Sequence, residues 1–562
     1  MKKSFLKRIL GFGLAVLATV SMTACGGKKP SDSNKEDPNK TNIHVFDYKA
    51  GYSDRWLTNL EAAFSKAYAN VSFEEGKTGV NFINITDMTT FNPAQITESE
   101  HDIFFFENEN YYKFVNAGVF ADISDIVNGK ATDSESKTIL EKLDDQQIDY
   151  YGAKSGDNTN YYALPSYYGN YGIIYDIDLF NERGFYIADN QDDGVIIGSN
   201  KGAKKSAGPD GEYGTPDDGL PATYDEFFAL CDEIYNNDVT PVCWPGKYRT
   251  HHLGNLMDNL ISDYEGVEQM RLNYTFNGEA TDLVVLDADG KVTFNEDGTL
   301  KTESKTITTA NGYEVGRQAG KYYAMNFIDR LISNSQYYTK ESFSNTFTHT
   351  DNQQLYLYSN SDLQKNVNPI AMLIDGPWWQ EEANNHFETM AKKNSKYSRT
   401  NRNFGWMPLP KATSDKVGSK NVYSDYLNAF VSIKAGLSDG LTRACKEFLR
   451  FSASDEMLKD FTLTTGAVKA YKYDMGSDLN KLSPFSKGLV SYIQDSDVVY
   501  KFSSSSFYNS NSSNLQYDVV YSAKVGGNLY KNAVDGINEG KASGTSYFEA
   551  FNKYFKAYSF WK

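Results

Sequence analysis

Three short stretches near the start of the chain have the hydrophobic pattern of β-strands. Residues 43–48 (IHVFDY) and 80–85 (VNFINI) read as strands, the first with clear alternation, and residues 102–106 (DIFFF) form the short apolar run of a buried parallel strand. A helical spacing of three to four residues is carried by Trp56, Leu57, Leu60, Ala63 and Phe64. This order of strand, helix and strand predicts an α/β lobe with a largely parallel sheet.

The pattern further along the chain is less regular. Residues 111–114 begin a helix, and residues 322–333 carry a longer helical pattern. Residues 287–298 (DADGKVTFNEDG) lie between two turn signals and predict a β-hairpin. Residues 187–221 are dense in Asp, Gly, Asn and Lys, which is typical of an excursion at the surface.

The first 41 residues have the pattern of an export signal followed by a stalk. Four basic residues precede an apolar run at 9–20, which is shorter than the ~20 residues needed to span a bilayer. Residues 22–26 (MTACG) resemble a lipobox, which predicts a signal peptide over 1–24 and a lipidated Cys25. An ordinary secretory signal is the alternative. Residues 25–41 are polar and predict the lipidated cysteine and a flexible stalk.

Length and charge limit the remaining possibilities. The 562-residue chain exceeds what one hydrophobic core supports, so we expect two lobes. Its formal net charge of −17 argues against nucleic acid as a partner, because binding to a phosphate backbone needs clustered cations. The 41 tyrosines are too many for a core to bury cheaply, so we expect many of them at the surface or lining a cleft.

Beyond Cys25, the chain contains Cys231, Cys243 and Cys445, with no CxxC spacing. A disulfide between Cys231 and Cys243 is open to an exported protein, but sequence does not establish a pair. Buried free thiols are the favoured interpretation.

Five motifs in order resemble the sugar-binding proteins that serve ABC transporters. The motifs are residues 164–180 (LP through YDIDLF), 221–227 (PATYDEF), 371–379 (AMLIDGPWW), 404–410 (FGWMPLP) and 430–468. The resemblance covers most of the mature chain and implies an α/β fold: a two-lobed, periplasmic-binding-protein-like (type II) flytrap with three interlobe crossings. It places the crossings near Tyr175, Asn428 and Tyr471.

The implied first lobe combines residues 42–174 with 429–470, and the second combines 175–428 with 471–562. A binding site for oligosaccharides needs aromatic platforms for the sugar faces and planar polar groups for the hydroxyls. In the family, the segment that contains Asp375, Trp378 and Trp379 borders the cleft. Because neighbouring helical residues point about 100° apart, we expect one tryptophan in the cleft and the other in the core.

Other candidate ligand-binding residues come from loops beside the first crossing and from strand ends. The loop before the first crossing supplies Tyr167, Tyr168, Asn170 and Tyr171. The end of a short run in the second lobe supplies Trp244, Tyr248 and Arg249, with a structural salt bridge favoured for the arginine. The first lobe supplies Tyr48, Tyr52, Glu107 and Asn108, where the alternative for the glutamate is a helix cap.

Sequence support for catalysis or for a cofactor is small. There is no HExxH motif, and residues 316–322 depart from a phosphate loop. Calcium is a weaker possibility: Asp210, Asp217 and Asp218, with residues 192–194 nearby, could supply oxygen ligands. Their spacing fails the EF-hand pattern, and plain Asp-Gly turns explain them equally well.

These patterns predict a lipid-anchored monomer on the outer face of the cell membrane that captures an oligosaccharide for the permease of an ABC transporter. The first alternative is a cell-surface glycan hydrolase with two carboxylates about 5–9.5 Å apart. The second is the same fold with a peptide or another polar solute as its ligand. We expect no cofactor, apart from the calcium possibility.

Overall fold

The computed structural model describes residues 35–48, 51–190, 195–196, 202–361, 363–364, 367–515 and 521–562. The predicted signal peptide and Cys25 lie outside the described residues. The last part of the predicted stalk already contacts the folded body, because the Asp37 N–H donates to Asn42 Oδ1 at 2.8 Å and the Asn39 carbonyl accepts from the Thr78 N–H at 2.8 Å. No helix among the described residues is long and apolar enough to cross a membrane.

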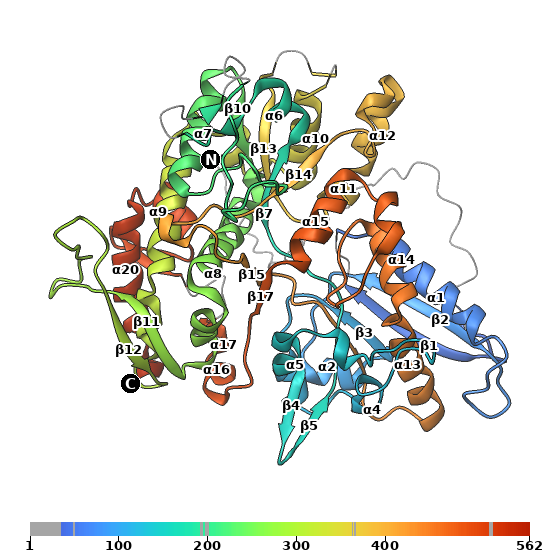
Figure 1. The fold of residues 1–562 in the computed structure, drawn as a ribbon. Coiled ribbons are helices and arrows are strands. Elements are labelled where there is room, and N and C mark those ends of the chain that lie inside the picture. The colour runs from blue at the N-terminus through green and yellow to red at the C-terminus, as the bar shows by residue number, and fades with distance from the viewer. Residues whose placement is uncertain are drawn as a thin grey trace, which may run out of the picture.

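A five-stranded sheet forms the centre of the first lobe (Figure 1). Its strand order is β2 (Val80–Asp87), β1 (Thr41–Tyr48), β3 (Ile103–Phe106), β16 (Phe430–Ile433) and β6 (Leu164–Pro165). β1 is parallel to β2 and β3, whereas β16 is antiparallel to β3 and β6. The three strands predicted from the hydrophobic pattern are therefore confirmed, with ends that differ by one or two residues.

Helices cover this sheet with their apolar faces. α1 (Arg55–Ala67) buries Trp56, Leu57, Leu60 and Phe64, which confirms the predicted helix. The other elements of the first lobe are α2 (Pro93–Glu98), α3 (Tyr111–Asn116), α4 (Ser124–Val127), α5 (Asp145–Tyr151), β4 (Gly152–Ser155), β5 (Asn158–Tyr161), α13 (Asp439–Ser452) and α14 (Asp455–Thr465).

A four-stranded sheet forms the centre of the second lobe. Its order is β10 (Thr240–Cys243), β13 (Ile370–Asp375), β7 (Gly172–Asp176) and β14 (Phe404–Met407). β13 is parallel to β10 and antiparallel to β7. The helices of this lobe are α6 (Ile177–Arg183), α7 (Tyr224–Asn236), α8 (Arg249–Thr275), α9 (Ala319–Ser333), α10 (His349–Ser359), α11 (Trp379–Glu382), α12 (Asn384–Lys393), α15 (Pro484–Gln494), α16 (Ser506–Ser510), α17 (Ser512–Leu515), α19 (Ala533–Asn538) and α20 (Gly544–Lys556).

Three segments, which we call the crossing segments, carry the chain between the two lobes. They are residues 166–171 between β6 and β7, residues 426–429 before β16, and residues 466–483 between α14 and α15. β15 (Val422–Asp425) and β17 (Asp497–Tyr500) form a parallel pair beside them. The first crossing precedes β7, whereas the sequence placed it near Tyr175; both flanking strands are buried, so the hydrophobic pattern does not mark the boundary.

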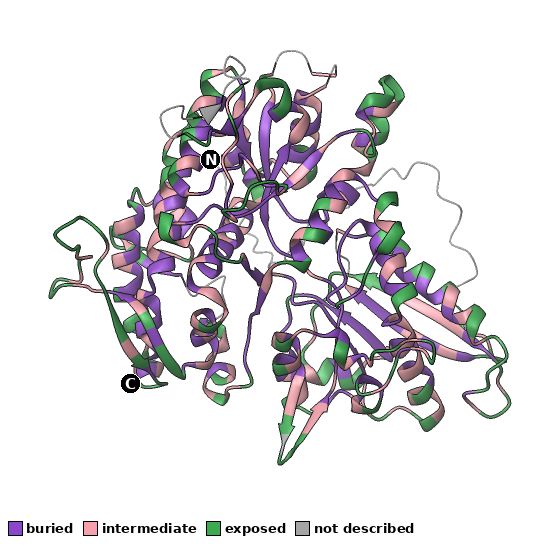
Figure 2. Cartoon of the chain, viewed as in Figure 1, coloured by how far each residue is buried: buried purple, intermediate pink, exposed green. Residues whose placement is uncertain are grey.

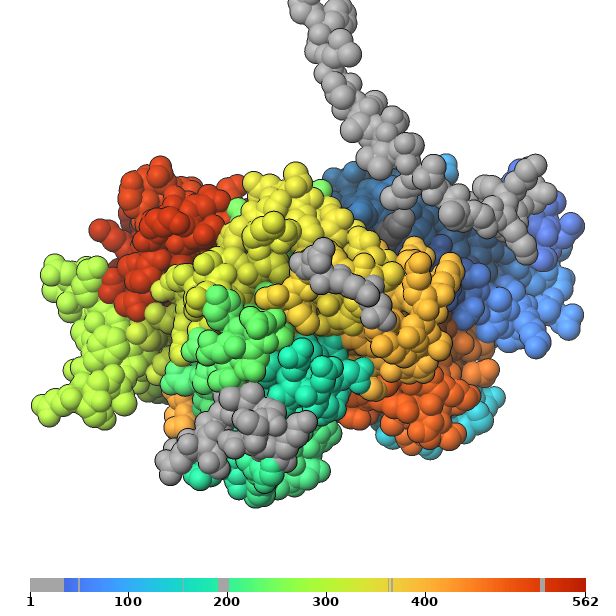
Figure 3. Space-filling view, turned by 90° about the horizontal axis from the view of Figure 1, so that it is seen from above, coloured from blue at the N-terminus to red at the C-terminus, as the bar shows by residue number. Residues whose placement is uncertain are grey.

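The second lobe also carries surface elements. β11 (Gly278–Val284) and β12 (Thr302–Ile307) form an antiparallel ribbon. The predicted hairpin at 287–298 lies at the exposed tip of this ribbon, which contains two turns (Figure 2). β8 (Tyr186–Ile187) pairs with β9 (Val195–Ile196), and β18 (Ala523–Val525) pairs with β19 (Asn528–Tyr530). The C-terminal helix α20 packs on α9, so that the end of the chain lies beside its middle (Figure 3).

The interior of each lobe is apolar and rich in aromatic side chains. In the second lobe, Trp379 is fully buried, with Phe404, Phe387 and Phe485 at ring-centroid distances of 5.0, 5.8 and 5.7 Å. Cys231, Cys243 and Cys445 are buried free thiols, which confirms the favoured interpretation over the disulfide.

Trp379→Ala should lower the free energy of unfolding by about 3–5 kcal/mol, because it removes a large buried ring and leaves a cavity. Urea unfolding followed by circular dichroism measures the change. Leu529→Ala is the control, because Leu529 is 50% exposed and its loss should change stability by less than about 0.5 kcal/mol. Equal effects of the two substitutions would contradict the assignment of Trp379 to the core.

Candidate ligand-binding site between the lobes

The strands of both sheets bring candidate residues to the boundary between the lobes. β1 ends at Tyr48, β3 ends before Glu107, and β13 ends at Asp375. Loops that follow the carboxyl ends of sheet strands are the usual binding positions of open α/β folds. Here the loop after β1 contacts the loop after β13, although these loops belong to different lobes.

Five rings form a continuous cluster across the boundary, which we call the aromatic bridge: Tyr52, Tyr167, Tyr171, Trp378 and Tyr426. The Tyr52 ring lies 6.1 Å from Trp378 at 83° and 4.9 Å from Tyr167. Trp378 lies 5.1 Å from Tyr171 at 85°, and Tyr426 lies 5.3 Å from Tyr171. These are edge-to-face contacts, each worth about 0.5–1.5 kcal/mol beyond the area that they bury.

The loop after β1 approaches the second lobe so closely that it needs a glycine. A Cβ atom on Gly51 would lie 2.7 Å from Glu382 Oε1 and 2.9 Å from the Trp378 ring. Beside it, Arg55 of α1 forms an ion pair with Glu381, which also binds Arg399 at 2.9 Å. The lobes are therefore in direct contact at this edge.

Ionisable groups of the first lobe lie buried beneath the bridge. The Tyr167 hydroxyl donates to Glu107 Oε1 at 2.6 Å. Burial raises the pKa of Glu107 to about 8, although this hydrogen bond opposes the shift. Burial, together with Asp54, raises the pKa of Asp47 to about 8, although Lys469 opposes this shift. Burial lowers the pKa of Lys469 to about 7. These groups are costly to bury, and such clusters are typical of functional sites.

The second lobe contributes a matching polar cluster. Gln353 Nε2 donates to Asp375 Oδ2 at 3.0 Å and to Glu382 Oε2 at 2.7 Å. Burial raises the pKa of both carboxyl groups to about 7, with Glu382 adding to the shift of Asp375. Burial also holds the pKa of His252, which contacts the Tyr171 ring at 4.7 Å, well below its usual value.

The sequence did not single out several residues of this site. His251 Nε2 lies 2.5 Å from the Tyr426 hydroxyl, so that the start of α8 is tied to the second crossing segment. Tyr426 lies two residues before the predicted crossing at Asn428 and could have been found from that position. Lys469 and Gln353 carried no comparable signal, because a single Lys or Gln in a mixed segment is unremarkable until the fold buries it.

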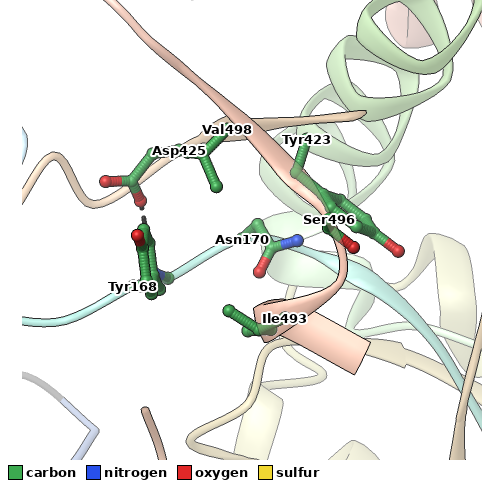
Figure 4. Close-up of a pocket in the computed structure, with 8 residues that line it drawn as sticks. Tyr168, Asn170, Tyr423, Asp425, Ile493, Ser496 and Val498 are labelled. Carbon is green, nitrogen blue, oxygen red and sulfur yellow. Dashed lines mark hydrogen bonds between the residues drawn. The ribbon is translucent and has the colours of Figure 1, made fainter. Parts of the chain in front are cut away.

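Two of the predicted loop residues face another direction. The Tyr168 hydroxyl donates to Asp144 Oδ2 at 3.0 Å, at the start of α5. Asn170 lines a cavity of about 10 Å³ with Tyr423, Asp425 and Ile493, which has room for about one water molecule (Figure 4). These residues are therefore not part of the aromatic bridge.

The remaining candidates separate into core and boundary positions. Trp244 is fully buried against Tyr338 and Phe343, and Arg249 pairs with Asp535 at 3.1 Å and Glu539 at 3.0 Å, which is the structural salt bridge favoured from the sequence. Trp379 lies in the core, as expected for one of the two tryptophans, and Trp378 lies in the aromatic bridge. Three candidates, Tyr48, Asn108 and Tyr248, keep some exposure.

The carboxylates considered for calcium are used within turns. Asp217 Oδ1 accepts from the Thr215 hydroxyl at 2.6 Å, Asp218 Oδ2 accepts from the Gly214 N–H at 2.9 Å, and Asp210 Oδ1 accepts from the Glu212 N–H at 2.8 Å. In the part of the chain that the structure describes, no group of three or more His, Cys, Asp or Glu side chains could hold a metal ion. Residues 192–194 lie outside it.

A family model described as bacterial extracellular solute-binding protein matches residues 73–472, so the chain belongs to this family of extracellular binding proteins. None of the curated proteins matches the chain. Among solved structures, the apo form of RafE from Streptococcus pneumoniae has a TM-score of 0.52 and 14% identity, over 93% of this chain and 100% of that chain.

Two further structures have the same two-lobed fold. A chitin oligosaccharide binding protein has a TM-score of 0.52 and 14% identity, over 92% of this chain and 98% of that one. Maltose-bound MalE3 from T. maritima has a TM-score of 0.50 and 13% identity, over 92% and 99%. The predicted type II binding-protein fold is confirmed.

Gly51→Ala should separate the lobes, because its Cβ would overlap Glu382 and Trp378. Small-angle X-ray scattering should show a larger radius of gyration than for the wild type. Gly488→Ala is the matched control, because a Cβ there would meet nothing within 4 Å. An unchanged radius for Gly51→Ala would contradict the interlobe contact.

Asp375→Asn should reduce the pH dependence of stability. The raised pKa of Asp375, about 7 against an ordinary 3.8, means that the native state binds more protons than the unfolded state between these pH values. Stability from this group is therefore full below about pH 4 and is lost as the pH rises through 7. Between pH 4 and 8, the wild type should lose about 1–3 kcal/mol more than the variant in urea unfolding. Identical losses would contradict the raised pKa.

Proposed function

We propose that this protein captures an oligosaccharide between its two lobes and delivers it to the permease of an ABC transporter, as a monomer anchored to the outer face of the membrane by an acylated Cys25. The aromatic bridge carries the proposal. Its rings come from both lobes and lie directly above buried carboxyl and amide groups. Aromatic faces suit the apolar sides of sugar rings, and planar polar groups suit their hydroxyls.

The known ligands of similar proteins support a carbohydrate. The neighbouring structures include RafE with raffinose, a chitin oligosaccharide binding protein and maltose-bound MalE3. The buried carboxyl groups of this chain have raised pKa values, so that they can donate as well as accept hydrogen bonds near neutral pH. A sugar hydroxyl can also do both, which makes neutral polyols a better match than charged peptide termini.

The lobe contacts supply a mechanism for capture. Opening the lobes would separate Tyr52 from Trp378 and expose both rings to solvent. A sugar that stacks on Trp378 and bonds to groups of both lobes would favour the closed arrangement, because it has more contacts there. The closed form would be the species that the permease binds.

The proposed anchor explains how captured ligand stays near its transporter. Nine residues separate Cys25 from Lys35, whose carbonyl accepts from Asn81 Nδ2 at 3.1 Å, and they would span roughly 15–18 Å as a coil. An acyl chain on such a stalk raises the local concentration of the binding lobes at the membrane without any new contact.

Trp378→Ala should weaken oligosaccharide binding by about 2 kcal/mol, or a factor of about 30, because it removes the central ring of the bridge. Isothermal titration calorimetry with raffinose, maltotriose and chitotriose measures the loss. Trp561→Ala is the control, because Trp561 has the same 7% exposure but packs near the C-terminus against Phe276. Unchanged affinity in Trp378→Ala would contradict the site, and release of shorter sugars on incubation would favour the hydrolase instead.

Cys25→Ala should move the protein from the membrane fraction to the medium, because it removes the only predicted acylation point. Fractionation and immunoblotting of cells that express the full chain measure this shift. Lys28→Ala, three residues further along the stalk, is the control and should stay in the membrane fraction. A membrane-bound Cys25→Ala protein would contradict the anchor and leave the sugar-binding proposal intact.

A further inference from the structure

A second cavity lies between the lobes, apart from the aromatic bridge. Its volume is about 190 Å³, enough for roughly six water molecules, or about one sugar ring. α5 of the first lobe and the second half of α8 form its walls, and residues 499–504, which follow β17, form its base. Unlike the bridge, this cavity is not filled by the protein's own side chains.

The crossing segments separate the cavity from the bridge. The side chain of Tyr167 points toward Tyr52 and Glu107 in the bridge. The next residue, Tyr168, instead points toward Asp144, which caps the start of α5. On this second face, Tyr500 stacks on Tyr150 of α5 with ring centroids 5.3 Å apart at 25°. Consecutive residues of an extended segment point to opposite faces, which explains the separation.

The walls combine rings with hydrogen-bonding groups. Five aromatic residues line the cavity, namely Tyr112, Tyr150, Tyr274, Tyr500 and Phe502. Gln146, Ser503 and Ser504 add amide and hydroxyl groups. Arg271 of α8 pairs with Asp149 of α5 at the same cavity, so that one ion pair joins the lobes across it. Lys154 of β4 also lines the cavity and donates to Thr159 Oγ1 at 2.7 Å. Rings together with amide, hydroxyl and ammonium donors suit the faces and the hydroxyl groups of a small polyol.

We propose that this cavity is a second carbohydrate site, for a single pyranose unit, and that its occupancy strengthens binding at the aromatic bridge. Because both lobes line the cavity, a sugar in it would favour the closed arrangement, in which groups of both lobes can reach a ligand at the bridge. Coupling of this kind is reciprocal, so ligand at the bridge also strengthens binding in the cavity. The coupling rests on the proposed function; the binding of a monosaccharide here does not.

Hydrogen exchange of the full folded chain with D-glucose, D-galactose or N-acetyl-D-glucosamine tests the site. We expect at least one sugar to protect residues 145–151 and 499–504 in a saturable manner, in the wild type and in Trp378→Ala. Val267→Trp places a large ring in the cavity and should abolish this protection, because Val267 lines it. Glu268→Trp is the matched control, because Glu268 is the next residue of α8 and is exposed. No protection by any of the three sugars, or unchanged protection in Val267→Trp, would overturn the site.

The coupling is tested by measuring oligosaccharide affinity with and without saturating monosaccharide, in the wild type and in Val267→Trp. The oligosaccharide is whichever of raffinose, maltotriose and chitotriose binds. Competition at the bridge affects the wild type and Val267→Trp equally, so the ratio between them isolates the cavity. We expect saturating monosaccharide to raise the oligosaccharide affinity of the wild type, relative to that of Val267→Trp, by about fivefold or more. A ratio of one would overturn the coupling. If the cavity binds a monosaccharide but none of the oligosaccharides binds anywhere, the proposed function fails and the cavity site stands.

Discussion

The contact between the loop after β1 and Trp378 is the constraint on which the arrangement of the lobes depends. Gly51 has no room for a side chain, and the next residue places its ring against Trp378 from the other lobe. The contact is reinforced by the ion pair of Arg55 with Glu381, whose carboxylate is also held by Arg399 within its own lobe. Besides the crossing segments and the ion pair of Arg271 with Asp149, this edge joins two lobes that have separate sheets.

Many ionisable groups are buried beside this contact. Glu107, Asp47 and Lys469 belong to the first lobe, and Asp375 and Glu382 belong to the second. Each is removed from water, and burial moves its pKa toward neutrality. A ligand that supplies hydroxyl groups at this boundary would compensate part of that lost hydration. The cost of burying these groups and the proposed affinity for a polyol thus have one origin.

The fold could be predicted from the sequence to a large extent, because strong local patterns coincide with its elements. The run at 102–106, the spacing from Trp56 to Phe64 and the GPWW segment each lie where the pattern predicts. The expectation that one of Trp378 and Trp379 faces the core also follows from helix geometry alone. The crossing near Tyr175 was misplaced by several residues, because β6 and β7 are both buried and the chain changes lobe without a change of pattern.

The site could be predicted only in part, because its members meet through tertiary contacts. Tyr52, Tyr167, Tyr171 and Trp378 were singled out as aromatic residues in loops, and the structure brings them together. Trp244 has the same sequence signal but lies in the core, since only the fold decides which side of a strand end faces inward. Gln353, His252 and Lys469 are distant in sequence and become members of the site only when each lobe folds.

The most direct test of ligand capture between the lobes is hydrogen exchange with an oligosaccharide that binds by calorimetry, such as raffinose or chitotriose. Capture at the aromatic bridge predicts slower exchange at residues 51–57 of the first lobe and at residues 376–383 of the second, in the same titration and with the same midpoint. Protection confined to one lobe, or no protection of either segment by a sugar that binds, would contradict the account.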